Sequence, residues 1–526
     1  MLLSIKRYLT GPYCLGDGPA INEPVPHKWL PGDVVDPETN AIIKRNPHRE
    51  IVGIVDFLNR TGMGFSNRNI PLYLFHPLDP KYPPMIVGSK NKYTTNKIAT
   101  VAIEHWTDKW PRAGIVSMLG DVGDSAIERK ALLLRASMPK LPATVDIVPN
   151  TSEHECVVWD TVFNIDPDGC EDVDDVICWR KTENGYEVAI AIADVSAWVV
   201  EGSELNTMAI HAGQTLYNDG VVVAPMLPTI LSTDFASLRA NGVSRPVLAF
   251  CFVVECGYVV SRTWRQLMVT VHRAYTYDSV LLDDTVCLIL PRLLTALSGS
   301  PVGEDPHHWI EVAMIAYNTA AAAVLRLTGA GLLRAHAGRA NTEWSALATT
   351  TGCRDLAFLG ASSGSYVPGD SLECAHAGLG LDVYCHASSP LRRYADLVNQ
   401  RWLRHLLFGA GRPFMAFADS VARHLNERGS TAKAYERDMW FLAHLRTDTI
   451  TTVTGFVLSI ADDSVAVYVP DWRRKIRGVA AVTVAIGDRV TIRAYTDLKR
   501  CSWSNRVVCS VYAITAITAI TGIATV

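Results

Sequence analysis

The stretch FNIDPDGCEDVDDVIC, which runs from Phe163 to Cys178, places five aspartates within ten residues. Apolar residues that favour β-strands precede, interrupt and follow these carboxylates, so the segment favours a buried or half-buried position. Two like charges about 4 Å apart repel by roughly 1 kcal/mol in water and by about 4 kcal/mol at an effective dielectric of about 20. Bound divalent cations would offset this repulsion, and all-oxygen ligands favour magnesium or manganese over zinc. The sequence therefore predicts a metal site, with the candidate ligands Asp166, Asp172, Asp174 and Asp175.

Two other structures could explain the same cluster. Clustered aspartates often belong to an acidic surface loop. An EF-hand calcium loop is the second alternative, and it needs acidic residues at positions 1, 3 and 5, glycine at 6 and glutamate at 12. Counting from Asp166, Asp168 fits position 3, but Cys170 falls at position 5, Glu171 at 6 and Ile177 at 12. The EF-hand is therefore excluded, and the acidic loop stays open as the simpler alternative.

A second informative segment, YCHASSPLRRYAD, runs from Tyr384 to Asp396. Ser389 followed by Pro390 predicts a helix start, because serine is a favoured N-cap and proline a favoured first helical residue. Apolar residues then recur at roughly helical spacing until Gly409. We therefore expect a helix that begins at Pro390.

Arg392 and Arg393 would lie in the first turn of this helix, where a cation opposes the helix dipole. A bound anion would resolve the conflict, because free backbone N–H groups and arginine side chains both favour phosphate. The alternative is an ion pair within the helix, from Arg393 or Arg392 to Asp396. Together with the carboxylates, a phosphate clamp points to phosphodiester chemistry.

At these two motifs the chain resembles the ribonuclease II (RNB) family of 3′→5′ exoribonucleases. The family's acidic signature has four aspartates with the spacing seen here, and residues 389–394 with Asp396 match its arginine signature. Two departures, Ala387-Ser388 for the commoner Phe-Thr and Gln400 for a usual histidine, touch neither the carboxylates nor Arg392, so we expect an active enzyme. Further family-like motifs stand in the same order at Ile192–Trp198, Leu216–Gly220, Pro225–Pro228, Leu231–Ser232, Ser237–Asn241, Arg245–Pro246, Glu311, Met314, Asn318 and Leu332–His336.

The resemblance implies an α+β multidomain fold, with an RNB catalytic domain at residues 150–450 flanked by OB-fold β-barrels. Short β-rich runs between turn residues agree with a cold-shock-type OB domain at 47–140 and an S1-like OB domain at 451–512. Residues 1–46 are loop-rich and could be a reduced cold-shock-type barrel, and 513–526 form an Ala-Ile-Thr repeat tail with no assigned function. The strand runs expected in the second barrel are Val453–Ile460, Val465–Val469, Val479–Val484 and Val490–Tyr495. The helices expected in the catalytic domain are Glu311–Leu327, Pro390–Phe408 and Phe417–Leu442, the last of which could break at Gly429.

These parts suggest hydrolysis with two bound Mg²⁺ ions, for which Mn²⁺ could substitute. The candidate catalytic residues are Asp174, which would orient water or a ligand, and Arg392, which would neutralise charge on the scissile phosphate. The resemblance implies single-stranded RNA as the substrate and nucleoside 5′-monophosphates as products, with Tyr217 beside the 3′-terminal nucleotide. The candidate RNA-binding residues are Tyr217, Arg393, Glu436, Arg473, Arg474 and Lys475.

Each RNA-binding candidate has a simpler alternative. Tyr217 could pack in the core, Glu436 could pair with Arg437 on a helix face, and the basic run at 473–477 could be an ordinary solvated loop. For the whole chain, the alternative is an RNA-binding protein with an RNB fold and lost or weak nuclease activity.

Length and composition agree with a multidomain nuclease. A chain of 526 residues should hold three or four domains, and 48% hydrophobic with 19% charged residues indicates a globular protein. Although the formal net charge of the whole chain is −4, two segments on either side of the predicted catalytic domain are basic. Residues 51–120 carry eight Lys/Arg against four Asp/Glu, and residues 451–526 carry nine against five, so each has a net charge of +4. Basic flanks suit a chain that follows phosphates.

Cysteine spacing and hydropathy restrict the cellular setting. The 12 cysteines include no Cys-x-x-Cys pair, so neither a zinc ribbon nor a disulfide framework is expected. The apolar run in the opening residues MLLSIKRYLTG is too short for a secretory signal peptide. No run of 18 apolar residues, as a transmembrane helix would need, occurs in the sequence. We expect an intracellular monomer with no membrane association, in the cytoplasm or alternatively the nucleus, and with unspecified protein partners.

Overall fold

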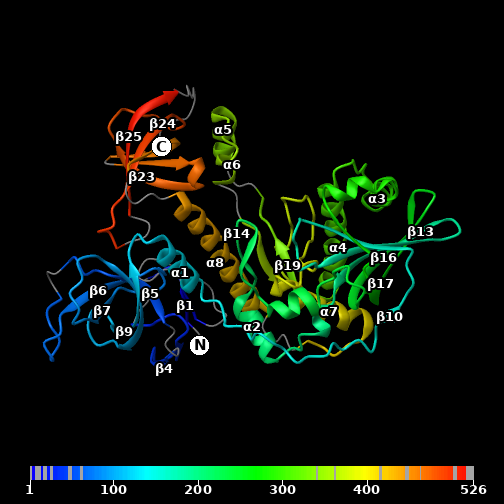
Figure 1. Cartoon of the computed structure of the whole chain (residues 1–526), viewed down its shortest axis with the longest axis horizontal. Helices are drawn as coiled ribbons and strands as arrows, with labels where there is room; N and C mark the ends of the chain where they lie inside the picture. Colours follow the sequence, from blue (N-terminus) through cyan, green and yellow to red (C-terminus); the bar gives the residue numbers. More distant parts are fainter. Residues whose placement is uncertain are drawn as a thin grey trace. The chain divides into compact units, whose positions relative to one another are not determined.

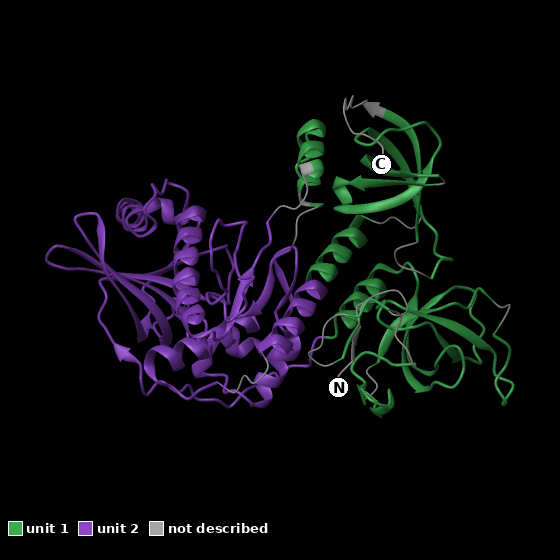
Figure 2. Cartoon of the chain, turned by 180° about the vertical axis from the view of Figure 1, so that it is seen from behind, with its two compact units in different colours: residues 1–137, 341–361, 433–526 green, residues 138–340, 362–432 purple. Residues whose placement is uncertain are grey.

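The computed structural model divides the chain into two compact units (Figure 2). One unit consists of residues 138–340 and 362–432, and the other of residues 1–137, 341–361 and 433–526. The structure describes residues 3–5, 13–15, 21–23, 28–45, 50–59, 63–338, 342–359, 363–413, 418–444, 449–462, 464–501 and 506–516.

A seven-stranded sheet forms the centre of the unit at 138–340 and 362–432 (Figure 1). Neighbouring strands are antiparallel except in the two outermost pairs, which are parallel. Strands β13 and β16 are apolar and buried over most of their length, so the centre of the sheet is covered on both faces. In spatial order the strands are β10 (Glu155–Cys156), β17 (Tyr258–Thr270), β16 (Ser244–Glu255), β13 (Gly185–Ala193), β12 (Asp175–Lys181), β11 (Thr161–Asp166) and β18 (Arg273–Thr276).

Helices and two short hairpins complete this unit. Helix α4 is typical: Asp305 caps it, proline stands at its first position, and Gly329 ends it with a left-handed φ of 67°. It is the one helix of the described residues whose length and composition would suit a membrane span, but its Trp309 and Tyr317 belong to the unit's core cluster. The helices are α2 (Glu204–Ala212), α3 (Asp284–Ser298), α4 (Pro306–Thr328), α7 (Tyr394–Phe408) and residues 418–432 of α8 (Ala418–His444), whose remaining residues belong to the other unit. The hairpins are β14 (Leu216–Asn218) with β15 (Val221–Ala224), and β19 (Leu332–Ala335) with β20 (Ser365–Pro368).

Two helix predictions need correction. Helix α7 begins at Tyr394 rather than at Pro390, so residues 390–392 form a turn and Arg393 is the N-cap. The physical reason is a tertiary contact: the Tyr394 N–H donates to Gly213 O at 2.9 Å instead of to Pro390 O, and the Arg393 backbone is extended, with φ −132° and ψ 123°. The possible break at Gly429 does not occur, because α8 continues through this residue.

Two closed five-stranded barrels belong to the other unit (Figure 1). Both connect their strands in the order 1-2-3-5-4, with the third and fifth strands parallel, which is the arrangement of an OB fold. The predicted α+β fold class with flanking barrels is therefore confirmed. The first barrel consists of β5 (Ile51–Val55), β6 (Leu72–Pro77), β7 (Met85–Gly88), β8 (Lys97–His105) and β9 (Arg112–Asp121), and α1 (Ser125–Ala136) follows it. The second consists of β21 (Thr451–Ala461), β22 (Ser464–Val469), β23 (Arg474–Ala480), β24 (Arg489–Thr496) and β25 (Val507–Ala516).

The third strand of the second barrel differs from the predicted run at Val479–Val484. Strand β23 ends at Ala480, so the basic run lies mostly in a strand and not in a loop. Ile476 points into the barrel core while Lys475 and Arg477 are exposed, and this alternation explains how a charged run forms a strand.

The remaining segments of this unit are short. Helices α5 (Thr342–Thr351) and α6 (Leu356–Leu359) contribute Leu347 and Leu356 to a small core with β21 and β22. Within residues 1–46 the described parts form two two-stranded sheets, and residues 517–526 of the Ala-Ile-Thr tail lie outside the described residues. The two sheets are β1 (Leu3–Ile5) with β2 (Tyr13–Leu15), and β3 (Val34–Val35) with β4 (Ile42–Lys44).

Candidate active site

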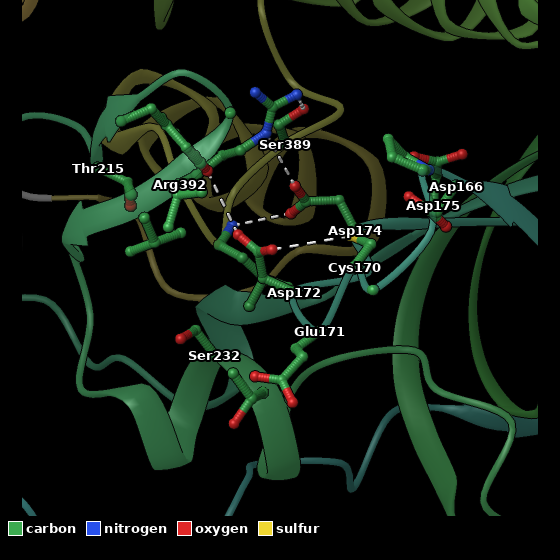
Figure 3. Close-up of a pocket in the computed structure, with 18 of the residues that line it drawn as sticks. Asp166, Cys170, Glu171, Asp172, Asp174, Asp175, Thr215, Ser232, Ser389 and Arg392 are labelled. Carbon is green, nitrogen blue, oxygen red and sulfur yellow. Dashed lines mark hydrogen bonds and ion pairs between the residues drawn. The ribbon is translucent and has the colours of Figure 1, made fainter. Parts of the chain in front are cut away.

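The acidic cluster lies where strands β11 and β12 approach their connecting loop. Asp166 is the last residue of β11 and Asp175 the first of β12, and the loop between them carries Asp172 and Asp174. All four aspartates line one cavity of about 760 Å³ (Figure 3). The antiparallel pairing of β11 with β12 thus gathers carboxylates that are up to nine residues apart in sequence.

Three further segments form the walls of this cavity. The β14–β15 hairpin and the residue before it contribute Tyr217 and Thr215, and the 389–392 turn contributes Arg392. A π-helical turn, Ile230–Phe235, contributes Ser232. Such turns are rare and frequently occur at functional sites.

Asp174 joins the two motifs that the sequence singled out. Its carboxylate is 4% exposed, and its Oδ1 accepts the Leu391 N–H at 2.9 Å. Its Oδ2 lies 3.4 Å from Arg392 Nε. Figure 3 shows the arginine side chain reaching over this carboxylate. The aspartate and arginine motifs, 217 residues apart at this contact, therefore meet in one cavity.

Burial and mutual repulsion act together on the cluster. Burial raises the pKa of Asp174 from its ordinary 3.8 to about 7, although Arg392 and the Leu391 N–H oppose the shift. Burial also raises the pKa of Asp166, with a contribution from Asp172. The pKa of Asp175 is raised well above its ordinary value by burial and by two neighbouring carboxylates.

This electrostatic state fits a site for divalent cations. Among the described residues, Arg392 makes the one ion pair to the cluster, so one guanidinium faces four carboxyl groups. The oxygen donors suit Mg²⁺ or Mn²⁺, whose charge would stabilise the ionised carboxylates. Asp166, Asp172 and Asp175 are the carboxylates left without an ion pair in the described part of the chain, and are the candidates to hold such ions.

Cys170 lines the cavity but is not among the site residues predicted from the sequence. Its Sγ lies 3.8 Å from Asp172 Oδ1, and burial together with Asp166 and Asp172 raises the pKa of its thiol. The thiol therefore stays protonated beside the cluster in the absence of metal. Its position within the run of aspartates is the sequence feature that could have predicted its place in the cavity.

The two arginines of the second motif have different environments. Arg392 is 44% exposed and donates from Nη2 to Ser389 Oγ at 3.1 Å, so part of its guanidinium faces the cavity. Arg393 pairs with the buried Asp396 at 2.7 Å. For Arg393, the structure thus shows the ion-pair alternative, and its contact with RNA stays a prediction.

Tyr217 lies in the cavity wall and not in the core cluster. Its hydroxyl donates to Asp172 Oδ2 at 3.3 Å. Burial, together with Asp172, raises the pKa of this phenol, so it remains a donor at neutral pH. The ring is therefore placed beside the carboxylates, as its predicted role requires.

The other four RNA-binding candidates belong to the unit with the barrels. Glu436 and Lys475 are exposed. Arg473 lies over the ring of Trp440, 3.9 Å from its centroid. Arg474 pairs with Asp438, which also pairs with another arginine of this unit, so its guanidinium is already engaged. The RNA contacts of all four stay predictions.

The raised pKa of Asp174 predicts how the metal-free protein responds to pH. An acid whose pKa is higher in the folded than in the unfolded state stabilises the fold below its unfolded pKa, and this stability is lost as pH rises through the folded pKa. Between pH 3.8 and about 7 the free energy of unfolding should therefore fall with increasing pH, at up to about 1.4 kcal/mol per pH unit for this group.

Thermal melting in a chelator at several pH values would measure this effect. The Asp174→Asn variant, which has no carboxyl group to titrate, should lose less stability across the same range, and added Mg²⁺ should stabilise the wild type most above pH 7. Identical pH slopes for the two proteins would contradict the prediction.

Comparison with known proteins was made on the sequence and on the fold. Residues 158–284 and 302–409 match the RNB domain, and residues 72–137 match the Dis3-like cold-shock domain 2 (CSD2). Exoribonuclease 2 of Aeromonas hydrophila is 27% identical over 54% of this chain and 53% of its own length. The mouse exosome complex exonuclease RRP44 is 23% identical over 82% of this chain and 54% of its own length. The chain thus spans about half the length of these curated relatives.

Solved structures with the same fold extend over more of the chain. The apo form of Mycoplasma genitalium RNase R has a TM-score of 0.71 at 18% identity and covers 97% of this chain and 100% of its own. Yeast Ssd1, described as a pseudonuclease, has a TM-score of 0.61 at 16% identity and covers 87% of this chain and 69% of its own. The chain is therefore similar to RNB-domain proteins over residues 158–284 and 302–409, carries a match to a Dis3-like cold-shock domain, and shares the architecture of RNase R.

Proposed function

We propose that the chain is a magnesium-dependent 3′→5′ exoribonuclease that hydrolyses single-stranded RNA to nucleoside 5′-monophosphates with two bound metal ions. The observation that carries this proposal is the contact of Asp174 with Leu391 and Arg392, which joins a carboxylate cluster and a guanidinium in one cavity. The relatives named exoribonuclease and exonuclease support the reaction class. The structure of M. genitalium RNase R in complex with ribose methylated single-stranded RNA supports the substrate class.

The four carboxylates would have different roles, which follow from the residues that each of them contacts. Asp166, Asp172 and Asp175 would hold the cations, because no ion pair occupies them among the described residues. Asp174 would hold the 389–392 turn through its Oδ1 and orient Arg392 through its Oδ2. When bound, Mg²⁺ supplies Lewis acidity that activates water and neutralises charge on the leaving oxygen, and Mn²⁺ could replace it.

Arg392 would bind the scissile phosphate. Its Nε faces Asp174 and its Nη2 faces Ser389, so the other N–H groups of its fork can reach an anion in the cavity. Because both contacts fix the guanidinium before substrate arrives, the charge that develops on phosphate meets a donor that needs little reorganisation.

A gel assay with 5′-labelled single-stranded RNA would test the function. Wild type with Mg²⁺ should give a descending ladder that ends in a short oligonucleotide, and mass spectrometry should identify nucleoside 5′-monophosphates. EDTA should stop the reaction, and a DNA strand of the same sequence should persist because it lacks the 2′-OH contacts. Binding without shortening would overturn the proposal.

An RNA-binding protein without nuclease activity is the second candidate. The observation that favours it is the shared fold with yeast Ssd1, a pseudonuclease. The complete set of four carboxylates favours the enzyme instead, because four repelling acids at one cavity are costly without cations. Wild-type RNA binding with no metal-dependent shortening would establish this second function.

Tyr217 is predicted to set the length of the final product. Replacing it with alanine should change the shortest oligonucleotide by at least about one nucleotide, because base–aromatic stacking is lost at the cavity wall. Tyr217→Phe keeps the ring and removes the hydrogen bond to Asp172, so it should keep the product length and slow turnover by about fivefold, or about 1 kcal/mol. An unchanged end product in the alanine variant would argue for a packing role only.

A further inference from the structure

Three donor side chains of different chemistry meet outside the cavity. The Asp56 carboxylate, the His76 imidazole and the Cys501 thiol offer one ligand atom each, and these atoms lie within 4.8 Å of one another. All three residues belong to the unit with the two barrels. Among the described residues, they are the one group of this kind that mixes oxygen, nitrogen and sulfur.

The first barrel places two of these donors. His76 in β6 stands opposite Ile54 in the antiparallel pair with β5. Asp56 lies two residues beyond Ile54, and its N–H donates to Leu74 O at 2.9 Å, so its side chain shares the outer face with His76. The inner face belongs to Val55, which packs in the barrel core.

The segment after β24 brings the third donor to this outer face. Cys501 is 9% exposed and packs with Ile54 and Val52 of β5, and Leu498 packs against the same cluster. Strand β5 is therefore buried on both faces, on one side by the barrel core and on the other by residues that follow the second barrel's fourth strand.

The donor atoms of His76 and Cys501 suit a metal that prefers nitrogen and sulfur ligands. Burial lowers the pKa of His76, which favours the neutral imidazole that binds metals, and neither ring nitrogen has a hydrogen-bond partner among the described residues. Burial, with Asp56, raises the pKa of Cys501 to about 12, so without metal its thiol stays protonated, and it donates to Lys499 O at 3.9 Å. A bound cation would displace that proton to solvent.

Asn96 supplies an independent indication of a ligand sulfur. It is 2% exposed, and its Nδ2 donates to Cys501 Sγ at 3.3 Å. The amide is held in this orientation because its Oδ1 accepts the Leu58 N–H at 3.1 Å and its Nδ2 also donates to Lys499 O at 3.2 Å. A fixed N–H directed at sulfur is the outer contact that stabilises a metal-bound thiolate.

We propose that Asp56, His76 and Cys501 bind one zinc ion that fastens the 497–501 segment to the first barrel. A thiolate, an imidazole and a carboxylate are zinc ligands, and they exclude Mg²⁺, which needs oxygen. Solvent would take the fourth position, since Asp56 and His76 are half-buried. The ion closes a loop between residues 445 positions apart in the chain (501 − 56) and should stabilise the folded unit.

Cobalt substitution of the full-length protein would test this site. After removal of metal under reducing conditions, added Co²⁺ should give the near-ultraviolet sulfur-to-cobalt absorption of a thiolate ligand. A second thiol, Cys170, lies beside the acidic cluster, for which divalent ions are also proposed. The matched pair is therefore Cys501→Ser, which should lose the absorption, and Cys170→Ser, which should keep it.

Further readouts make the outcome decisive. Zinc should raise the melting temperature of wild type by several degrees and that of Cys501→Ser by none, and metal analysis should find one zinc fewer in the variant. His76→Gln should weaken the cobalt absorption, and it replaces Cys501→Ser if that variant does not fold. Absorption that is absent in wild type, or that survives in Cys501→Ser or unchanged in His76→Gln, would overturn the proposal. RNA shortening tests the other site, so the two proposals can fail separately.

Discussion

Asp174→Asn should abolish RNA shortening while leaving RNA binding within about threefold of wild type. Asparagine has the same shape but no charge, so it removes both the attraction to Arg392 and one carboxylate of the cluster. Its amide oxygen can still accept the Leu391 N–H, which keeps the turn in place. Loss of about 4 kcal/mol of transition-state stabilisation would lower turnover by about a thousandfold.

Single-turnover cleavage and equilibrium RNA binding, measured with the same oligonucleotide, would separate these effects. Asp168→Asn is the matched control, because Asp168 is the fifth aspartate of the same run and lines the same cavity, but it is exposed at the tip of the loop. That variant should keep its turnover within about an order of magnitude of wild type. Equal losses in the two variants would mean that total negative charge, and not the position of Asp174, decides the rate.

The local sequence was sufficient for the acidic cluster because all its members lie on one hairpin. Apolar residues around Asp166 and Asp175 predicted buried strands, and pairing of those strands brought the carboxylates together. The start of α7 was predicted wrongly because Ser389 and Pro390 follow the local rule for a helix start, whereas tertiary contacts decide it. The Tyr394 N–H donates to Gly213 O, which is distant in sequence, instead of continuing the helix back to Pro390.

Two other features could not be predicted from the sequence because they also depend on tertiary contacts. The basic run of the second barrel resembled a loop, but a single apolar position, Ile476, was enough to place it in β23. The mixed cluster of Asp56, His76 and Cys501 has no motif spacing, because its third member follows the second by 425 residues (501 − 76). Only the packing of the 497–501 segment on β5 brings that cysteine to the other two donors.

Arg392→Ala should lower turnover by about 100- to 1,000-fold with little change in protein stability. The side chain is 44% exposed, so its removal leaves no cavity in the core, and Asp174 keeps its bond from the Leu391 N–H. The lost quantity is a positioned charge facing the scissile phosphate, which is worth about 3–4 kcal/mol in sites of this kind. Turnover should fall more than RNA affinity, because the charge on phosphate grows in the transition state.

The neighbouring arginine provides the comparison that makes this result specific. Arg393→Ala leaves the fully buried Asp396 without its ion pair, so it should destabilise the fold by roughly 3 kcal/mol. Arg392→Lys keeps a positive charge but loses the Nε donor and the planar fork, and should recover only part of the lost turnover. The opposite result would be a lower melting temperature for Arg392→Ala, and a loss of turnover with an unchanged melting temperature for Arg393→Ala. In that case Arg393 would be the phosphate-binding residue and Arg392 the structural one.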